Sequence, residues 1–437
     1  MKLQPIITSL LETDLYKFSM GQAIYHQFPT YKTTWTFRCR NKDVKFTKEM
    51  VNEIREQIQY YCFLRFTEDE LNYLGKIKWF KEAYIDFLRI WKPRFEDFII
   101  STEPIVHEDD DEYDEEDPIE QYDCGLYIET RGTWLNTSMY EIPTLAIVNE
   151  VYFRMNYDYN ELFDSFKSRL DVKFNKVANN EFMLGTFSEF GLRRRLSAEA
   201  QELAVKTFTE LPKLKTISGF NNITVAPPVV CDSTFVGTSN VYLAKKFGIT
   251  PVGTMAHEWI MCVGQGDHSH NPAYSNKFAL DAWIREYGVL NGIALTDTIT
   301  TDCFLRDFDL TKATLFSGVR HDSGDPFAWG EKMIGAYNNL GLDPKTKTLL
   351  FSDSLNFEKA DKIYRYFAGK AKVAFGIGTY IANDTNVPAL NIVMKTTFCN
   401  GQDVAKISDV AGKGMCKNPK YVDYLQRCID WRLTHEN

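Results

Sequence analysis

The spacing of hydrophobic and polar positions changes at about residue 140 of the chain. Beyond that point short strand-like apolar runs recur, and longer stretches with helical spacing separate them. The expected strands are 183–188, 234–239, 251–256, 292–297, 315–320, 348–353, 372–377 and 390–395, and the helices between them include 197–211, 275–287, 327–340 and 356–369. Strands that alternate with helices favour a parallel sheet, and this many repeats predict an irregular, TIM-like β/α barrel.

The N-terminal part mixes helical and strand patterns without a regular repeat. Segments with helical spacing are 14–28, 47–60 and 80–90, and segments that resemble strands are 31–38 and 125–135. Thr47 and Glu49 are typical of the start of the second of these helices. We therefore expect an α/β N-terminal domain over residues 1–140, a β/α barrel over 141–397, and a C-terminal tail, about 398–437, that joins the N-terminal domain.

An acidic run, EDDDEYDEED, occupies residues 108–117. Such a run could bind a partner or a metal ion, but blocks of like charge repel themselves and resist packing. The strand pattern that follows at 125–135 favours a solvated loop at the tip of a hairpin.

Composition and charge restrict the class of protein. The chain has 437 residues, of which 44% are hydrophobic and 25% are charged, a balance typical of a globular protein with a large core. Its formal net charge of −9 argues against general nucleic-acid binding. The nine cysteines contain no CxxC pair, which is typical of reduced intracellular thiols. Because no apolar run resembles a signal peptide or is long enough to span a membrane, we expect a cytoplasmic protein.

Polar side chains stand at the end of nearly every expected barrel strand. They are Ser188 and Glu189, Thr238 and Ser239, His257 and Glu258, Asp297, Arg320, His321 and Asp322, Asp353, Gly376, Gly378 and Thr379, and Lys395. The carboxyl ends of the strands of a β/α barrel converge on the active site. The repetition therefore predicts an active-site mouth.

Two segments could bind phosphate. The GIGT turn at 376–379 presents unobstructed backbone N–H groups, although short glycine turns are common without a ligand. The triplet Arg193, Arg194 and Arg195 is either a solvated helix start or an anion site. Positive charge at a helix N-terminus opposes the helix dipole, which favours an anionic ligand. The chain has neither a GxxxxGK[ST] loop nor a GxGxxG fingerprint.

Asp322 and Asp353 each have more than one chemical role open to them. Asp322 lies in GVRHDSGDP (318–326), and Asp353 lies in FSDS. Either carboxylate could accept hydrogen bonds from sugar hydroxyls, bind Mg²⁺ through water, or only close a tight turn.

His257 is the histidine whose position is most informative. A lone histidine at a strand end is more often a hydrogen-bonded core residue than a catalyst. Beside Glu258 and facing anion-binding loops, it could also be a base, a nucleophile or a phosphoryl acceptor. His268 and His270 lack a suitable third ligand, so no metal site is assigned to them.

Eight segments in order resemble the nicotinate phosphoribosyltransferase family. They are TDLYK (13–17), FSEFGLRRR (187–195), FVGTSN (235–240), GTMAHEW (253–259), ALTDT (294–298), GVRHDSGDP (318–326), FSDSLN (351–356) and FGIGT (375–379). The resemblance implies an irregular β/α barrel beside an α/β domain. It also implies that nicotinate and 5-phosphoribosyl 1-diphosphate form nicotinate mononucleotide and diphosphate in NAD biosynthesis. ATP hydrolysis would be coupled to this reaction through a phosphorylated His257.

The resemblance implies roles for individual residues. Nicotinate would contact Phe190, Ser239, Thr254, Arg320 and, from the neighbouring subunit of a homodimer, Tyr16. The phosphoribosyl donor would contact Arg193, Asp353, Gly376, Gly378 and Thr379. Asp322 would act in catalysis beside His257, and Asp322 and Asp353 would contact the ribose hydroxyls and Mg²⁺. No dedicated general base is needed, because the attacking pyridine nitrogen carries no proton.

Three alternative functions are a nicotinamide phosphoribosyltransferase, a quinolinate phosphoribosyltransferase and a non-catalytic barrel that only binds a ligand. In the first, an Asp replaces Ser239 and accepts from the neutral amide, so Ser239 favours the acid as substrate. The second needs extra basic residues for another carboxylate. A degenerate relative is expected to lose some of His257, Arg320 and Asp322, and all three are present. Leu192 departs from the family pattern, in which a small polar residue is common there.

Overall fold

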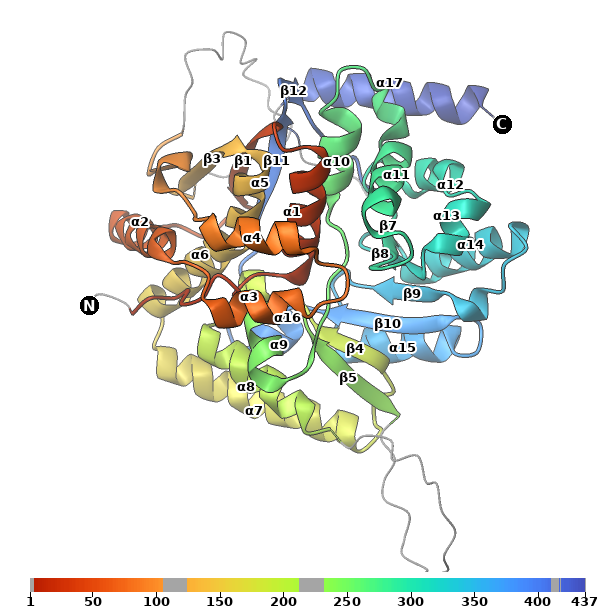
Figure 1. The fold of residues 1–437 in the computed structure, drawn as a ribbon. Coiled ribbons are helices and arrows are strands. Elements are labelled where there is room, and N and C mark those ends of the chain that lie inside the picture. Colours follow the sequence, from red (N-terminus) through yellow and green to blue (C-terminus); the bar gives the residue numbers. More distant parts are fainter. Residues whose placement is uncertain (1–3, 105–123, 212–231, 410–415, 417, 437) are drawn as a thin grey trace, which may run out of the picture.

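The computed structural model describes residues 4–104, 124–211, 232–409, 416 and 418–436. The acidic run at 108–117 therefore lies outside the described residues. The described chain forms a seven-stranded sheet and a five-stranded sheet, with helices around both (Figure 1). This arrangement confirms the expected α/β class, in which a barrel-like sheet lies beside a second sheet with its own helices.

The seven-stranded sheet is parallel throughout and has the order β6-β5-β4-β10-β9-β8-β7. Its strands are β4 (Gly185–Glu189), β5 (Ser233–Thr238), β6 (Thr250–Pro251), β7 (Ile293–Leu295), β8 (Gly318–His321), β9 (Thr348–Phe351) and β10 (Lys372–Ile377). Within the described ranges β6 and β7 do not pair with each other, so the sheet is an open, incomplete barrel. The helices that follow its strands are α8 (Ala198–Thr209), α9 (Val241–Phe247), α10 (His257–Gln265), α11 (Ser275–Tyr287), α12 (Thr301–Asp307), α13 (Leu310–Leu315), α14 (Pro326–Asn339), α15 (Phe357–Phe367) and α16 (Thr379–Ala382).

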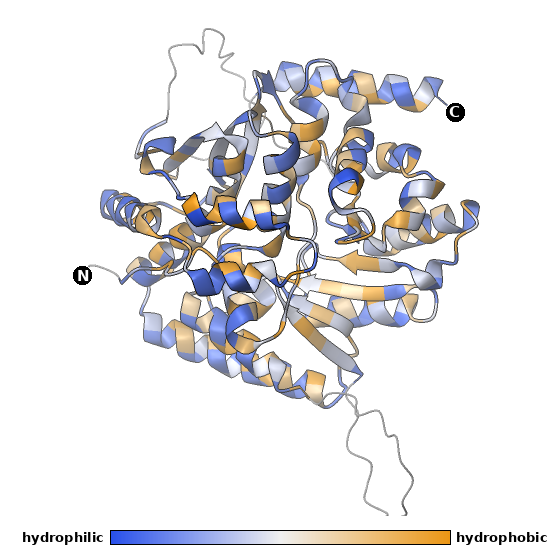
Figure 2. Ribbon diagram, viewed as in Figure 1, coloured by the Kyte–Doolittle hydropathy of each residue, from blue (hydrophilic) through white to orange (hydrophobic). Residues whose placement is uncertain are grey.

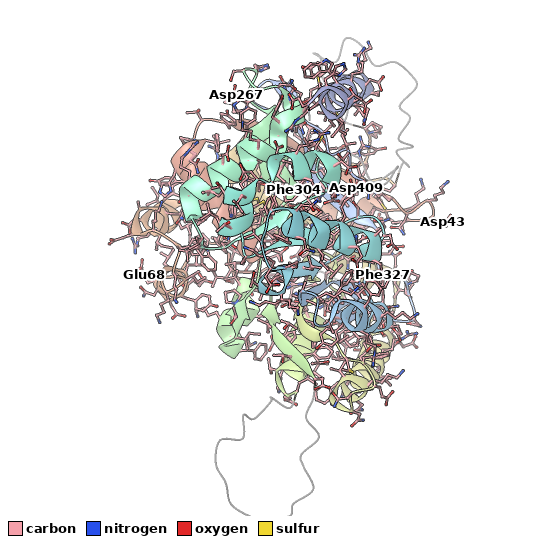
Figure 3. All side chains as sticks on the ribbon, turned by 90° about the vertical axis from the view of Figure 1, so that its right-hand side faces the viewer. Asp43, Glu68, Asp267, Phe304, Phe327 and Asp409 are labelled. Carbon is pink, nitrogen blue, oxygen red and sulfur yellow. The ribbon has the colours of Figure 1, made fainter. Side chains whose placement is uncertain are left out.

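Helix α15 illustrates why these segments cover the sheet. Its buried side chains are Phe357, Ala360, Ile363 and Phe367. They recur every three or four residues and therefore share one face of the helix. Phe367 stacks on Phe351 of β9, with the ring centroids 5.7 Å apart. In Figure 3 these outer helices face the viewer, and the labelled side chains Phe327 of α14 and Phe304 of α12 lie on that side of the molecule.

The five-stranded sheet is antiparallel and has the order β12-β11-β1-β3-β2. Its strands are β1 (Lys32–Cys39), β2 (Phe98–Ser101), β3 (Tyr127–Thr133), β11 (Ile392–Cys399) and β12 (Gln402–Asp403). The remaining helices are α1 (Leu15–Gln27), α2 (Lys48–Phe63), α3 (Glu68–Gly75), α4 (Glu82–Ile90), α5 (Trp134–Thr137), α6 (Glu141–Asn156), α7 (Tyr159–Ala178) and α17 (Pro419–His435). Thr47 caps α2 as expected, because its hydroxyl accepts from the backbone N–H of Met50.

The placement of the eighth expected barrel strand, 390–395, is wrong. This segment forms β11, which pairs antiparallel with β1, so that Met394 lies opposite Phe37. Both side chains are buried. An apolar pattern predicts that a strand has a buried face, but not which strand it pairs with. The expected strand 251–256 is also too long, because pairing stops at Pro251. The division into domains stays a prediction.

The N-terminal segment lies against the carboxyl end of the parallel sheet, next to β5. The backbone N–H of Leu15 donates to the carbonyl of Ser239 over 3.0 Å, and Asp14 forms a bridge with Asn240. The start of α1 therefore meets the carboxyl end of β5, and residues from both sheets can share one site. Figure 2 shows hydrophobic residues along the parallel strands and hydrophilic ones on the outer turns of the helices. Among the described helices, none is both long and apolar enough to cross a membrane.

Candidate active site

A cavity of about 630 Å³ lies where the ends of β8, β9 and β10 face β11. A smaller space of about 40 Å³ adjoins it. The two share Glu141, Arg193, His257, Arg320, Asp322 and Lys395 in their walls. Many of the side chains that the sequence places at strand ends therefore line one mouth, as the barrel pattern predicts, whereas Ser188, Glu189, Thr238, Ser239, Asp297 and His321 do not line it.

Most of the predicted site residues line this cavity. They are Phe190, Arg193, His257, Arg320, Asp322, Asp353, Gly376, Gly378 and Thr379, with Tyr16 in the smaller space. Two predicted residues lie behind the wall instead. Thr254 is buried and accepts from Nη1 of Arg320 over 3.0 Å. Ser239 is also buried, and its hydroxyl donates to Oδ1 of Asp14 over 2.6 Å.

His257 is the first residue of α10, and its imidazole is enclosed by polar side chains. Its Nε2 lies 3.0 Å from Oδ2 of Asp322 and 3.0 Å from Nζ of Lys406. Its Nδ1 lies 3.0 Å from the hydroxyl of Thr298. Burial, and secondarily the ammonium of Lys406, lower the pKa of His257 to about 4. The ring is therefore neutral at physiological pH and keeps a lone pair for a nucleophilic role.

Arg320, at the end of β8, is held by three hydrogen bonds. It donates from Nη2 to Oδ1 of Asp322 over 2.8 Å and from Nε to the hydroxyl of Ser352 over 2.8 Å, besides its bond to Thr254. Burial alone would raise the pKa of Asp322, but Arg320 and His257 outweigh it and hold that pKa well below its usual range. The result is an ionised carboxylate and a fixed guanidinium at the cavity wall.

Gly376 is required because Phe190 packs directly on its backbone. A Cβ at position 376 would lie 2.3 Å from Cδ2 of Phe190, far inside van der Waals contact. The backbone N–H of Phe190 also donates to the carbonyl of Ile377 over 2.8 Å. These contacts fix an aromatic side chain beside the turn formed by Gly376, Gly378 and Thr379 in the cavity wall.

The arginine triplet divides between two environments. Arg193 and Arg194 line the cavity, to which they add positive charge. Arg195 is fully buried and donates to Glu12 over 2.8 Å and to the carbonyl of Ile6 over 3.1 Å. Leu192 is buried too, so its departure from the expected polar type affects packing rather than the cavity.

Tyr16 lines the smaller space together with His257 of the same chain. The resemblance implies that the neighbouring subunit supplies this tyrosine to the ligand, which stays a prediction; within this chain, α1 brings Tyr16 to the smaller space. The reason is the docking of the N-terminal segment on the end of β5, described above. Whether Tyr16 contacts a ligand stays a prediction.

Lys406, Arg40 and Glu141 are cavity residues that the sequence patterns did not indicate. Lys395 was expected at a strand end but lies within β11, where burial lowers its pKa to about 8. One signal could have identified Lys406: it is a single charge in the apolar stretch VAKI, and its side chain is buried. A lone buried lysine requires an acidic partner.

A metal ion does not fit the cluster of His257, Asp297 and Asp322. One ligand atom from each lies within 4.8 Å of the others, a spacing that could hold an ion. However, Nζ of Lys406 lies 3.0 Å from Oδ2 of Asp297 and 3.0 Å from Nε2 of His257. The ammonium thus already supplies the positive charge among these groups.

An open β/α barrel whose strand ends surround a basic cavity with a glycine turn defines an enzyme-type site for a phosphorylated small molecule. The chain matches the nicotinate phosphoribosyltransferase (NAPRTase) family over residues 186–431 and the N-terminal domain of that family over residues 11–149. The chain therefore belongs to the nicotinate phosphoribosyltransferase family.

Similar proteins cover the chain almost completely. A protein from Cupriavidus necator named nicotinate phosphoribosyltransferase is 40% identical over 97% of this chain and 98% of its own. One of the same name from Bordetella petrii is 41% identical, with the same coverage of both chains. The crystal structure of the Porphyromonas gingivalis nicotinate phosphoribosyltransferase has a TM-score of 0.82 and 32% identity over 97% of this chain and 100% of that one. The Vibrio cholerae structure of that name has a TM-score of 0.81 and 32% identity over 97% and 94%.

Proposed function

We propose that this protein joins nicotinate to 5-phosphoribosyl 1-diphosphate, forming nicotinate mononucleotide and diphosphate in the biosynthesis of NAD. The observation that carries the proposal is that one cavity unites His257, Arg320 and the glycine turn at 376–379. The family membership and the names of the relatives support the same reaction.

The cavity offers a partner for each part of the two substrates. Phe190 and Tyr16 would cover the pyridine ring, and Arg320, steadied by Thr254, would bind its carboxylate. The position of Ser239 would favour the acid over the amide. Arg193 and the turn of Gly376, Gly378 and Thr379 would bind the phosphates, and Asp353 the ribose hydroxyls.

The chemistry needs positioning and charge stabilisation rather than a base. The lone pair of the pyridine nitrogen attacks C1 of the ribose while the C1–O bond to diphosphate breaks, and no proton has to leave the ring. The carboxylate of Asp322 would stabilise the cationic sugar centre, and the arginines the departing diphosphate.

ATP hydrolysis would be coupled through phosphorylation of His257. Its low pKa supports this role, because a neutral imidazole is the nucleophilic form. Mg²⁺ would enter with the phosphates of the substrates, which is how that ion usually binds. We further propose a cytoplasmic location and a homodimer, with an N-terminal domain over 1–140, a barrel domain over 141–397, and the tail 398–437 joined to the former.

The test is an assay of diphosphate release with nicotinate and with nicotinamide, with and without ATP. We expect nicotinate to be the preferred substrate and ATP to accelerate its conversion. His257→Ala should lose the ATP effect and keep some slow transfer. Preference for nicotinamide, or release without a pyridine substrate, would refute the proposal.

A further inference from the structure

Lys406 reaches the active site from the far end of the chain. It follows β12, and its side chain is only 8% exposed. Its Nζ lies 3.0 Å from Nε2 of His257, a residue 149 positions earlier, and 3.0 Å from Oδ2 of Asp297. It also lines the large cavity. A buried ammonium in direct contact with the central histidine is too specific an arrangement to be explained by packing alone.

The segment around Lys406 is fixed on both sides of it. The backbone N–H of Ala405 donates to Oε1 of Gln265 over 2.7 Å, and that of Ile407 donates to the carbonyl of Thr298 over 2.9 Å. Asp409, labelled in Figure 3, accepts from the backbone N–H of Thr301 over 2.7 Å. The ammonium is thereby held in one place, which is what a preorganised charge requires.

The negative charge around His257 explains why a phosphoryl group would need a cation beside this histidine. Asp297 and Asp322 both lie near His257, and both keep pKa values below the usual range despite burial. Two carboxylates would repel a phosphoryl group, which carries about two negative charges of its own. Arg320 is engaged with Asp322. Arg320 thus offsets the charge of Asp322. Lys406, which contacts Asp297, offsets the charge of that second carboxylate.

The ammonium also has donor capacity left. A lysine has three N–H donors, and two of them are accounted for by His257 and Asp297 among the described residues. Oδ1 of Asp297 has no hydrogen-bond partner in the same part of the chain. Among the described residues, the cluster therefore has one N–H donor of Lys406 and one acceptor oxygen of Asp297 without a hydrogen-bond partner.

We propose that Lys406 binds the phosphoryl group as it passes from ATP to His257. The inference rests on the ATP coupling proposed above. In this step a lone pair of the neutral imidazole forms the N–P bond. The bond from the γ-phosphorus to its bridging oxygen breaks, and its electron pair leaves with ADP. The ring keeps its proton on the other nitrogen, and Lys406 donates to a phosphoryl oxygen throughout.

The experiment compares two lysines of equal burial. Lys406→Met removes the charge beside His257, and Lys406→Arg keeps it. Lys347→Met is the matched control, because Lys347 is also 8% exposed and, among the residues that the structure describes, donates only to the carbonyls of Thr314 and Phe316. The full-length variants are mixed with ATP labelled in the γ-phosphate, and acid-labile protein phosphate is measured in a single turnover. Transfer to nicotinate without ATP is measured in parallel.

We expect Lys406→Met to slow phosphorylation of His257 by on the order of 100-fold, the usual cost of a lost charge-stabilising donor. Transfer without ATP should fall much less. Lys406→Arg should recover part of the rate, and Lys347→Met should phosphorylate as the unmodified protein does.

Equal losses of phosphorylation and of ATP-free transfer in Lys406→Met would overturn the inference, because they indicate a structural role. So would phosphorylation at the normal rate. If Lys406→Met does not fold, the double variant Lys406→Met with Asp297→Asn removes the unpaired carboxylate and takes its place in the same assays. Absence of labelled phosphate in the unmodified protein would instead refute the proposed ATP coupling.

Discussion

Two buried charge clusters meet at the adjacent residues His257 and Glu258, and they differ in how completely the chain pairs them. In the first, Nζ of Lys17 is fully buried, lies 2.7 Å from Oε2 of Glu141, and contacts Glu258 as well. Glu258 also accepts from the hydroxyl of Ser138 over 2.5 Å. This cluster, called the closed cluster below, joins α1, α6 and α10.

The second group consists of His257, Asp322, Arg320 and Lys406, which line the cavity, and of Asp297, which is buried and pairs with Lys406. One carboxylate oxygen in it has no hydrogen-bond partner among the described residues. We call it the open cluster. Buried charges that are fully paired within the chain hold elements together, whereas charges left partly unpaired at a cavity are available to a ligand. The position of a charged residue in the sequence does not show to which kind of cluster it belongs, because the adjacent residues His257 and Glu258 belong to different clusters.

The largest effect is expected from breaking the closed cluster. Lys17→Met removes the cation shared by two interior carboxylates, of which Glu141 keeps Arg193 at 3.4 Å while Glu258 loses its ion pair, and should lower the free energy of unfolding by about 3–5 kcal/mol. Urea unfolding followed by circular dichroism measures this. Lys245→Met is the control, because its partner Asp69 is 80% exposed, and it should cost less than about 1 kcal/mol. Equal costs for the two variants would contradict the distinction.

In the open cluster, Arg320→Gln should reduce function more than stability. We expect kcat/KM for nicotinate to fall by about 10²–10³-fold, because a fixed charge-assisted donor is lost at the cavity wall. The free energy of unfolding should fall by less than in Lys17→Met, since the cavity admits water to Asp322. Steady-state kinetics and urea unfolding of the same sample test both parts. A larger loss of stability than of kcat/KM would reverse the assignment of the clusters.

The open cluster should also make stability depend on pH. The pKa of His257 is about 4 in the folded protein, against 6.5 for a free histidine. The unfolded state therefore binds the proton more tightly, so this contribution is complete above pH 6.5 and is lost as pH falls towards 4. The loss is on the order of 3 kcal/mol. His257→Asn should remove this part of the pH dependence in unfolding experiments between pH 4 and 7. An unchanged profile would contradict the low pKa.

The smallest effect is expected from an uncharged change in the cavity wall. Gly376→Ala places a methyl group against Phe190 and should cost about 1–3 kcal/mol of stability through overpacking, while raising the KM for nicotinate. Gly335→Ala in α14 is the control, because a Cβ there meets nothing within 4 Å. It should be neutral or stabilising by up to about 1 kcal/mol. Unfolding and nicotinate kinetics distinguish the two.

Residues whose positions depend on local sequence could be placed from it. The glycine turn at 376–379, His257 and Arg320 stand at strand ends, and the structure brings them to one cavity. Contacts could not be predicted from the sequence where the partner lies far along the chain. Ser239 was assigned to the ligand, yet its hydroxyl bonds to Asp14 behind the wall, and Lys406 was missed.

The sequence by itself determined the alternation of strands and helices, the helix cap at Thr47 and the family, because these depend on spacing and on short ordered motifs. Only the tertiary structure decided that 390–395 pairs with β1, that Arg195 is structural while Arg193 faces the cavity, and that Lys406 lies on His257. Apolar spacing shows that a side chain is buried, but the partner of a strand or a charge is set by which distant segments pack together.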